Sequence, residues 1–225
     1  MSNSKMISYT RLSPNNSGKR TMKIDRITPH CVVGQCSVET LGRIFSSPDR
    51  KASSNYGIGS DGRIGMYVPE NKRSWCSSSA ENDQRAVTIE CASETSAPYE
   101  MNGDVYKTLV KLCVDICKRN GKTVLLWFGD KEKTLAYSPK PNEMVLTVHR
   151  WFANKSCPGK WLYSRLGSLA TTVTKELSET GKPDNNLYRV QVGTFQDKRN
   201  AETCLAKIKK NGFPDAFITV VKDHK

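Results

Sequence analysis

The sequence has no run of eighteen apolar residues, so it contains no segment typical of a transmembrane helix. Its first twenty residues, MSNSKMISYTRLSPNNSGKR, are polar and contain neither an apolar stretch nor a small-residue cleavage site. We therefore expect no secretory signal and no membrane insertion. A target outside the cytoplasm would have to be reached through another factor.

Histidine is also scarce, with three residues in 225, and the eight cysteines form no repeated CxxC pair. The missing pairs make a structural zinc ribbon an unfavoured interpretation. Without a secretion signal, most of the cysteines are expected to be reduced and buried.

Positive charge is abundant, with a formal net charge of +13. Residues 1–185 hold 27 basic and 18 acidic side chains, residues 186–225 hold 8 and 4, and no run of five basic residues occurs. Such a surface attracts an anionic partner. A phosphate-rich cell wall would attract it as well as DNA would, and no recognisable nucleic-acid motif supports DNA binding.

Strand patterns alternate with helix patterns along most of the chain. Strands are predicted at 24–33, 55–68 (two strands around a turn at 60–62), 86–92 and 123–129, and helices at 37–47, 104–120 and 162–177. Pro29 indicates an edge position or an abrupt end for the first strand. This order predicts an α/β class with a mixed central sheet flanked by helices. We expect residues 1–23 to form an irregular arm over this domain, which ends at residue 177.

A second, smaller unit is predicted after a linker. Residues 178–186, SETGKPDNN, are polar and contain Gly and Pro. Residues 187–225 then show a strand pattern, LYRVQVG, a helix pattern, RNAETCLAKIKKNG, and a second strand pattern, DAFITVV. This β-α-β unit is too small to build a sufficient core alone.

Two of the histidines lie near the predicted ends of strands, where ligand-binding groups collect in α/β sheets. His30 ends the first strand, and His149 opens the stretch HRWFANKSCPG, which also holds Lys155 and Cys157. Two imidazoles and a thiolate with a free fourth position are typical of a catalytic zinc site. The alternative is a hydrogen-bonded core histidine and a small buried cysteine without a common role.

Glu90 is the one carboxylate in the strand AVTIECA, on the face opposite Val87, Ile89 and Cys91. A carboxylate there is costly unless it meets a cation or takes part in proton transfer. Two interpretations stay open: a catalytic acid–base, or an ion pair with Arg85.

Four motifs in order resemble the zinc-dependent N-acetylmuramoyl-L-alanine amidases of the type 2 and peptidoglycan recognition protein family. They are ITPHC, NYGIGSDGRI, NDQRAVTIECA and HRWFANKSCPG, and the resemblance runs from about residue 24 to residue 177. It implies that His30, His149 and Cys157 bind Zn²⁺, that Glu90 is the carboxylate which hydrogen-bonds or deprotonates the zinc-activated water, and that Lys155 stabilises the oxyanion.

At two places the sequence departs from the family pattern. Ser54 stands where many members have a tyrosine near the metal, and Tyr56 stands where phenylalanine is usual, so no catalytic tyrosine is assigned. Cys76 follows Trp75 where relatives often have a histidine. We expect Cys76 to line the groove, without a role that the sequence supplies.

The resemblance implies hydrolysis of the amide between N-acetylmuramic acid and L-alanine in peptidoglycan, here of a Gram-positive wall. The favoured biological setting is a phage or prophage endolysin, cytoplasmic until a holin releases it, and a host autolysin exported by another route is the other setting. The alternative is a non-catalytic peptidoglycan-binding receptor on the same fold, which the three retained ligands disfavour.

The C-terminal unit resembles half of a SPOR module, a family that binds peptidoglycan, through LYRVQVGTF and AETCLAKIKKNGF. A full module has two such units in one sheet. A homodimer could complete the sheet, whereas a short appendage docked on the catalytic domain is the other interpretation.

Overall fold

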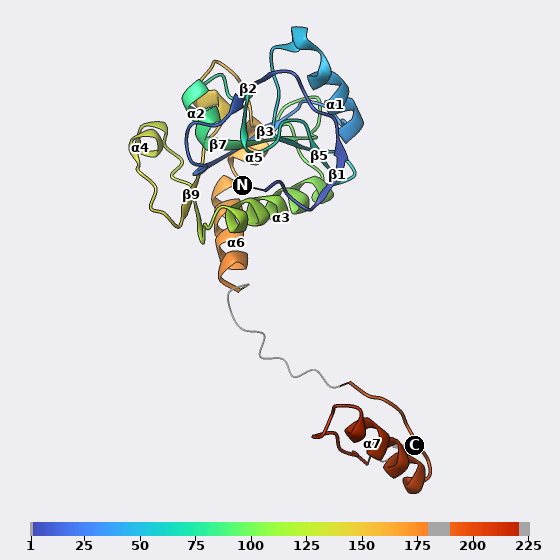
Figure 1. Cartoon of the computed structure of the whole chain (residues 1–225). Helices are drawn as coiled ribbons and strands as arrows, with labels where there is room; N and C mark the ends of the chain where they lie inside the picture. Colours follow the sequence, from blue (N-terminus) through green and yellow to red (C-terminus); the bar gives the residue numbers. More distant parts are fainter. Residues whose placement is uncertain (1, 180–189, 221–225) are drawn as a thin grey trace. The chain divides into compact units, whose positions relative to one another are not determined.

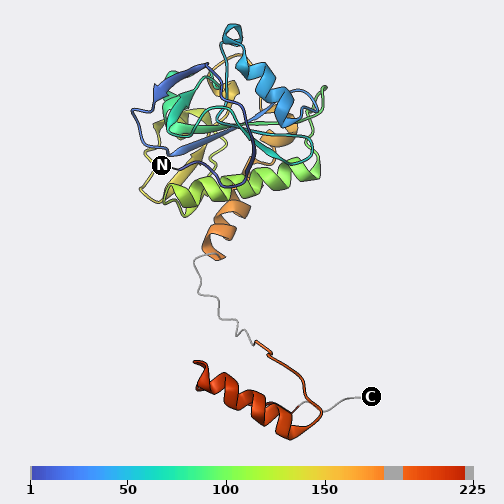
Figure 2. The same cartoon turned by 45° about the vertical axis from the view of Figure 1, so that its right-hand side comes forward.

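The computed structural model describes residues 2–179 and 190–220, which fall into two compact units, Met1–Lys182 and Pro183–Lys225 (Figures 1 and 2). The predicted linker at 178–186 lies mostly outside the described residues. Among the described residues, no helix is long and apolar enough to cross a membrane.

A seven-stranded mixed sheet forms the centre of the first unit, in the order β1-β5-β4-β7-β3-β9-β8. Every neighbouring pair is parallel except the hairpin of β4 and β5. The strands are β1 (Ile7–Thr10), β3 (Arg26–Cys31), β4 (Tyr56–Ile58), β5 (Ile64–Met66), β7 (Ala86–Cys91), β8 (Val124–Leu126) and β9 (Glu143–Leu146). A separate antiparallel pair joins β2 (Asn16–Lys19) to β6 (Lys72–Ser74).

Helices cover both faces of the sheet. In Figures 1 and 2, α3 (Gly103–Arg119) and α6 (Leu166–Glu179) lie on one face, and α1 (Val38–Ser46) and α2 (Ala80–Arg85) lie on the other. The shorter helices are α4 (Lys131–Ala136), α5 (Gly159–Tyr163) and the 3-10 turns η1 (Pro48–Arg50) and η2 (His149–Trp151). This arrangement confirms the predicted α/β class with a mixed sheet.

Local sequence explains why α3 forms where it does. The side chain of Asn102 caps its first turn by accepting from the Val105 amide. The predicted apolar stripe is fully buried in the main core, and Gly121 adopts a φ of 67° just after the helix. The larger core cluster, which α3 and α6 share with the sheet, anchors the strands that carry the site.

The two faces of β3 and β7 differ in character, and this difference positions the site. Val87, Ile89 and Cys91 lie in the main core, as the alternation predicts. His30 of β3 and Glu90 of β7 alternate to the opposite face and are paired in register with each other. The sheet therefore places an imidazole beside a carboxylate from strands sixty residues apart in the chain.

The prediction that Pro29 marks an edge strand is wrong, because β3 lies between β7 and β9. β9 pairs only with Arg26 and Ile27, and its last hydrogen bond runs from the Thr147 amide to the Ile27 carbonyl. The backbone of Pro29 faces the same side as that of Ile27, but β9 no longer pairs with β3 at this position. The missing N–H of Pro29 therefore removes no hydrogen bond between β3 and β9.

The predicted irregular arm at 1–23 is instead part of the fold, since it supplies β1 at the sheet edge and β2. Arg20, only 8% exposed, fixes its end by donating to the Glu70 and Ala86 carbonyls and to Asn55 Oδ1. Its burial lowers the Arg20 pKa to about 10. The sequence analysis did not predict β1 and β2, because a strand of four residues shows too few alternations of apolar and polar residues to be identified.

The last predicted helix of this unit is two helices, α5 and α6, separated at residues 164–165. The predicted stripe of Leu166, Leu169, Val173 and Leu177 is nevertheless buried against the core. The apolar periodicity therefore predicted which side chains are buried, but it did not predict the break between the two helices.

In the second unit only the helix is formed, as α7 (Lys198–Lys210). The strands predicted at 187–193 and 215–221 are absent from their described parts, 190–193 and 215–220, and residues 187–189 and 221 lie outside the described residues. A strand is stabilised by a hydrogen-bonded neighbour, and these two segments do not pair with each other within the described residues. Over the described residues, the predicted β-α-β unit is thus corrected to a helix between segments without regular secondary structure.

Candidate metal centre

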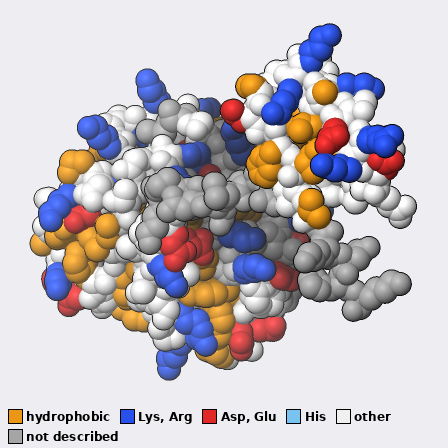
Figure 3. Space-filling model, turned by 90° about the horizontal axis from the view of Figure 1, so that it is seen from below, with side chains coloured by type: hydrophobic (Ala, Val, Ile, Leu, Met, Phe, Trp, Pro, Cys, Tyr) orange, Lys and Arg blue, Asp and Glu red, His pale blue; other side chains and the backbone are white. Residues whose placement is uncertain are grey.

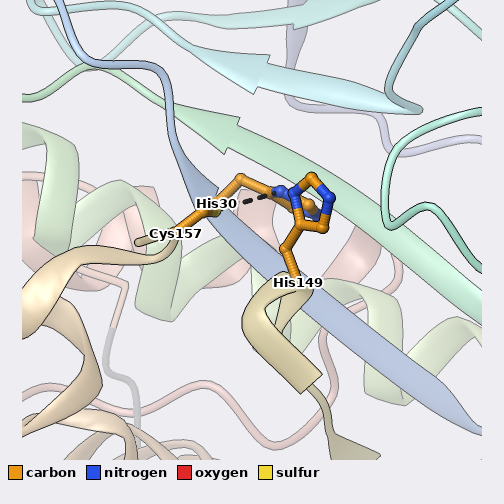
Figure 4. A group of neighbouring side chains, drawn as sticks. All are labelled: His30, His149 and Cys157. Atoms are coloured by element: carbon orange, nitrogen blue, oxygen red, sulfur yellow. Dashed lines mark hydrogen bonds between the residues drawn. The ribbon is translucent and has the colours of Figure 1, made fainter. Parts of the chain in front are cut away.

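Three potential ligands converge at the carboxyl end of β3. His30 comes from the strand itself, His149 from η2 and Cys157 from the loop before α5 (Figure 4). One ligand atom of each lies within 4.8 Å of the others, and Cys157 Sγ lies 3.2 Å from His30 Nδ1. The structure therefore brings together the three residues that the sequence predicts as metal ligands.

His30 is held as a neutral imidazole. It is 1% exposed, and burial together with the neighbouring His149 ring lowers its pKa to about 3. Its Nε2 is buried and has no hydrogen-bond partner among the described residues. A neutral imidazole in a buried site is the form that binds a metal ion.

His149 is oriented by a residue that the sequence analysis missed. Ser78 Oγ lies 2.9 Å from His149 Nε2. A proton on Nε2, donated to Ser78, leaves the lone pair of Nδ1 available to an ion. Ser78 has a positive φ of 62° in a turn between β6 and α2, and no sequence pattern connects it to a histidine 71 positions away.

Glu90 is not paired with Arg85, because Arg85 forms a bidentate ion pair with Asp25. Instead Glu90 Oε1 lies 3.9 Å from His30 Nδ1 and accepts from the Cys76 thiol at 3.8 Å. Burial raises the pKa of Glu90 to about 7. This value suits a group that takes up and releases a proton near neutral pH, so the geometry favours the acid–base interpretation over the ion pair.

A cavity of about 640 Å³ opens onto the site. Glu90, His149, Cys76 and Lys155 are among its lining residues, so the predicted catalytic lysine faces the same space as the carboxylate. Lys155 is exposed and also lines a second depression of about 610 Å³ with Tyr99. An extended substrate can therefore reach the centre across an open, basic surface.

The donor set fits zinc. Thiolate and imidazole ligands disfavour magnesium, calcium and manganese, and three protein ligands leave a fourth position for water or substrate. The buried, unpartnered Nε2 of His30 and Oε2 of Glu90 mark a polar pocket whose hydrogen-bonding capacity the protein alone does not satisfy.

Residues 20–160 match the sequence family described as N-acetylmuramoyl-L-alanine amidase. The chain belongs to this amidase family. Residues 160–223 match the SPOR domain family, so the chain combines an amidase domain with a SPOR module. The first part of the SPOR match covers α5 and α6, whose apolar side chains pack in the amidase core.

Solved structures also match this chain. A selenomethionine AmpD derivative matches with a TM-score of 0.52 at 17% identity, over 78% of this chain and 96% of that chain. A mutant endolysin from Bacillus subtilis matches at 0.48 and 19%, over 77% and 99%. Human PGRP-IBETAC, in complex with glycosamyl muramyl pentapeptide, matches at 0.49 and 17%, over 70% and 88%. No match is found among the curated proteins.

Neither residue considered for the family's tyrosine lies at the amidase site. Ser54 is buried and donates to the Tyr56 carbonyl. The Tyr56 hydroxyl donates to Glu70 at 2.7 Å and accepts from the Ser4 amide at 3.0 Å. Burial raises the pKa of Tyr56, so this hydroxyl stays protonated in a structural network.

Proposed function

We propose that the protein is a zinc-dependent amidase that hydrolyses the bond between N-acetylmuramic acid and L-alanine in peptidoglycan. The observation that carries the proposal is the convergence of His30, His149 and Cys157 within 4.8 Å, with Glu90 paired in register beside His30. Membership of the amidase family supports the reaction class.

The chain's own residues divide the chemistry between them. A zinc ion held by the two histidines and the cysteine would supply Lewis-acid activation of water and of the amide carbonyl. Glu90 accepts a proton from the attacking water and returns it to the alanine nitrogen as the C–N bond breaks. Lys155 donates a hydrogen bond to the carbonyl oxygen as negative charge develops there.

We further propose a lytic role on Gram-positive walls, as an endolysin that stays cytoplasmic until a holin releases it. The SPOR match supports attachment of the second unit to peptidoglycan. The net charge of +13 favours contact with a wall rich in phosphate.

Digestion of purified Gram-positive walls, with and without a zinc chelator, tests the function. We expect new alanine amino termini that disappear with chelator and return with Zn²⁺. New reducing sugars would instead indicate a glycosidase and a wrong assignment of the site. Wall binding with neither product would favour the receptor.

Homodimerisation through the second unit is a separate proposal. Among the described residues of this unit, seven large apolar side chains are exposed, and Figure 3 shows hydrophobic side chains gathered on it among lysines and arginines. They are Val190, Val192, Phe195, Phe213, Phe217, Ile218 and Val220. A second copy would cover them and provide a pairing partner for the segments that flank α7.

Sedimentation equilibrium tests the dimer. We expect the full chain to dimerise and a chain ending at residue 182 to stay monomeric. The Phe217→Glu variant should dissociate, because it places a charge on the apolar surface. A full chain that is monomeric at every concentration would contradict the dimer and favour an appendage.

A further inference from the structure

A second group of potential ligands surrounds His30. One ligand atom each of His30, Cys76 and Glu90 lies within 4.8 Å of the others. Glu90 Oε1 is 3.8 Å from Cys76 Sγ and 3.9 Å from His30 Nδ1. Cys76 therefore does more than line the groove.

These separations suit a common ion. Tetrahedral bonds of about 2.0–2.3 Å place neighbouring ligand atoms roughly 3.5 Å apart. The Glu90–Cys76 and Glu90–His30 separations exceed that spacing by a few tenths of an ångström, and the His30 and Cys76 ligand atoms lie within 4.8 Å of each other. The Cys76 backbone is fixed, since its amide donates to Asp83 Oδ2 at 3.0 Å.

Charge also favours this second group for a divalent ion. His30, Cys76 and Glu90 supply a neutral imidazole, a thiolate and a carboxylate, which balance two positive charges. The catalytic group supplies two imidazoles and one thiolate, which leaves one positive charge in excess. This balance limits the desolvation free energy of an ion held there, while Glu90 also lies close to the catalytic group through His30 Nδ1.

Access differs between the two groups as well. Cys76 and Glu90 line the 640 Å³ cavity, whereas His30 and Cys157 are not among its lining residues. Of the catalytic group, His149 lines this cavity.

We propose that His30, Cys76 and Glu90 form a second position for a thiophilic divalent ion, which shares His30 with the catalytic position so that an ion occupies one or the other. When the Cys76 sulfur binds the ion, its proton is released to solvent. Since Glu90 is then a ligand, it cannot take the proton of the attacking water, so occupancy of this position inhibits hydrolysis. This consequence rests on the proposed function, whereas the binding itself does not.

Cadmium binding to the metal-free full chain tests the proposal, with the thiolate-to-cadmium charge-transfer absorption as the signal. All variants carry Cys204→Ser, because that thiol belongs to the other unit. Cys157→Ser should still bind one Cd²⁺ with this absorption, and Cys157→Ser/Cys76→Ser should lose it. The matched control is Cys157→Ser/Cys36→Ser, since Cys36 lines the same cavity outside the group, and it should keep the absorption.

Two results would overturn the second position: no absorption in Cys157→Ser, or absorption that survives in Cys157→Ser/Cys76→Ser. If Cys157→Ser/Cys76→Ser does not fold, Cys157→Ser/Glu90→Gln replaces it. We expect this variant to bind Cd²⁺ at least tenfold more weakly than Cys157→Ser, and an unchanged affinity would contradict the proposal. Failure of the proposed amidase function would be seen in a different experiment. The zinc-loaded chain with Cys157 intact would then release no new alanine amino termini, and this result does not depend on cadmium binding.

Discussion

At the scale of single residues, the site depends on side chains that hold other side chains in place. His149 is a ligand candidate whose second nitrogen contacts Ser78 Oγ at 2.9 Å. Such partners fix the tautomer and the ring orientation of a metal-binding histidine. Ser78 is therefore a positioning residue rather than a ligand.

Replacing Ser78 by alanine should weaken zinc binding by about tenfold, because the His149 ring loses the partner that selects its tautomer. Competition with a chromophoric chelator measures this change. Ser168→Ala, on an exposed position of α6, is the control and should bind zinc like the parent chain. Equal affinity of the Ser78→Ala and parent chains would contradict the role.

Lys155→Gln should lower the hydrolysis rate by about 10²–10³-fold, because the developing oxyanion loses its donor. Zinc content should stay unchanged, since Lys155 is not a ligand candidate. Lys160→Gln is the matched control: Lys160 is exposed and lines only the neighbouring depression. A full rate in Lys155→Gln would remove this residue from the mechanism.

At the scale of elements, polar contacts attach the helices on the site's face to the sheet. Asn82 of α2 donates to Thr28 Oγ1 of β3 at 3.0 Å and accepts from Thr147 Oγ1 at 3.0 Å. On the same face, Arg63 joins Glu39 of α1 to Asp61 in the β4–β5 turn. These bonds add to a small apolar cluster of Leu41, Phe45 and Tyr67 on this face, whereas the larger core fills the opposite face.

The Glu39–Arg63 pair gives a pH prediction. Hydrogen bonds from Arg63 lower the pKa of Glu39 to about 2, below its ordinary value of 4.5. The pair therefore stabilises the fold above about pH 4.5, and this contribution disappears as the pH falls through about 2. NMR titration of the Glu39 carboxyl should show a midpoint near 2, and Arg63→Gln should return it toward 4.5; an ordinary midpoint in the parent chain would contradict the pair.

At the scale of the whole molecule, two compact units are joined in one basic chain. The second unit buries none of the side chains of α7, and its helix carries five basic residues. These are Lys198, Arg199, Lys207, Lys209 and Lys210. A surface of this kind supplies long-range attraction to anionic wall polymers.

Binding of the full chain to walls should therefore weaken several-fold between about 50 mM and about 500 mM salt, because the screening length falls from above 10 Å to a few ångströms. Pull-down with insoluble walls measures it. Exchanging Lys207, Lys209 and Lys210 for glutamine keeps good helix formers and should reduce the salt dependence. Wall binding that does not change with salt concentration would show that charge does not attach the protein to the wall.

The sequence by itself determined the features that short-range pattern encodes: the α/β order, the buried stripes of α3 and α6, the hairpin around Gly62, and the residues His30, Glu90, His149, Lys155 and Cys157 in family order. Only the tertiary structure decided which of these meet. Cys157 and His30 are 127 positions apart, and Glu90 reaches His30 through strand register. Cys76, Ser78 and the buried Arg20 gain their roles from packing alone. Periodicity and capping act over a few residues, whereas register and burial depend on the whole assembled sheet.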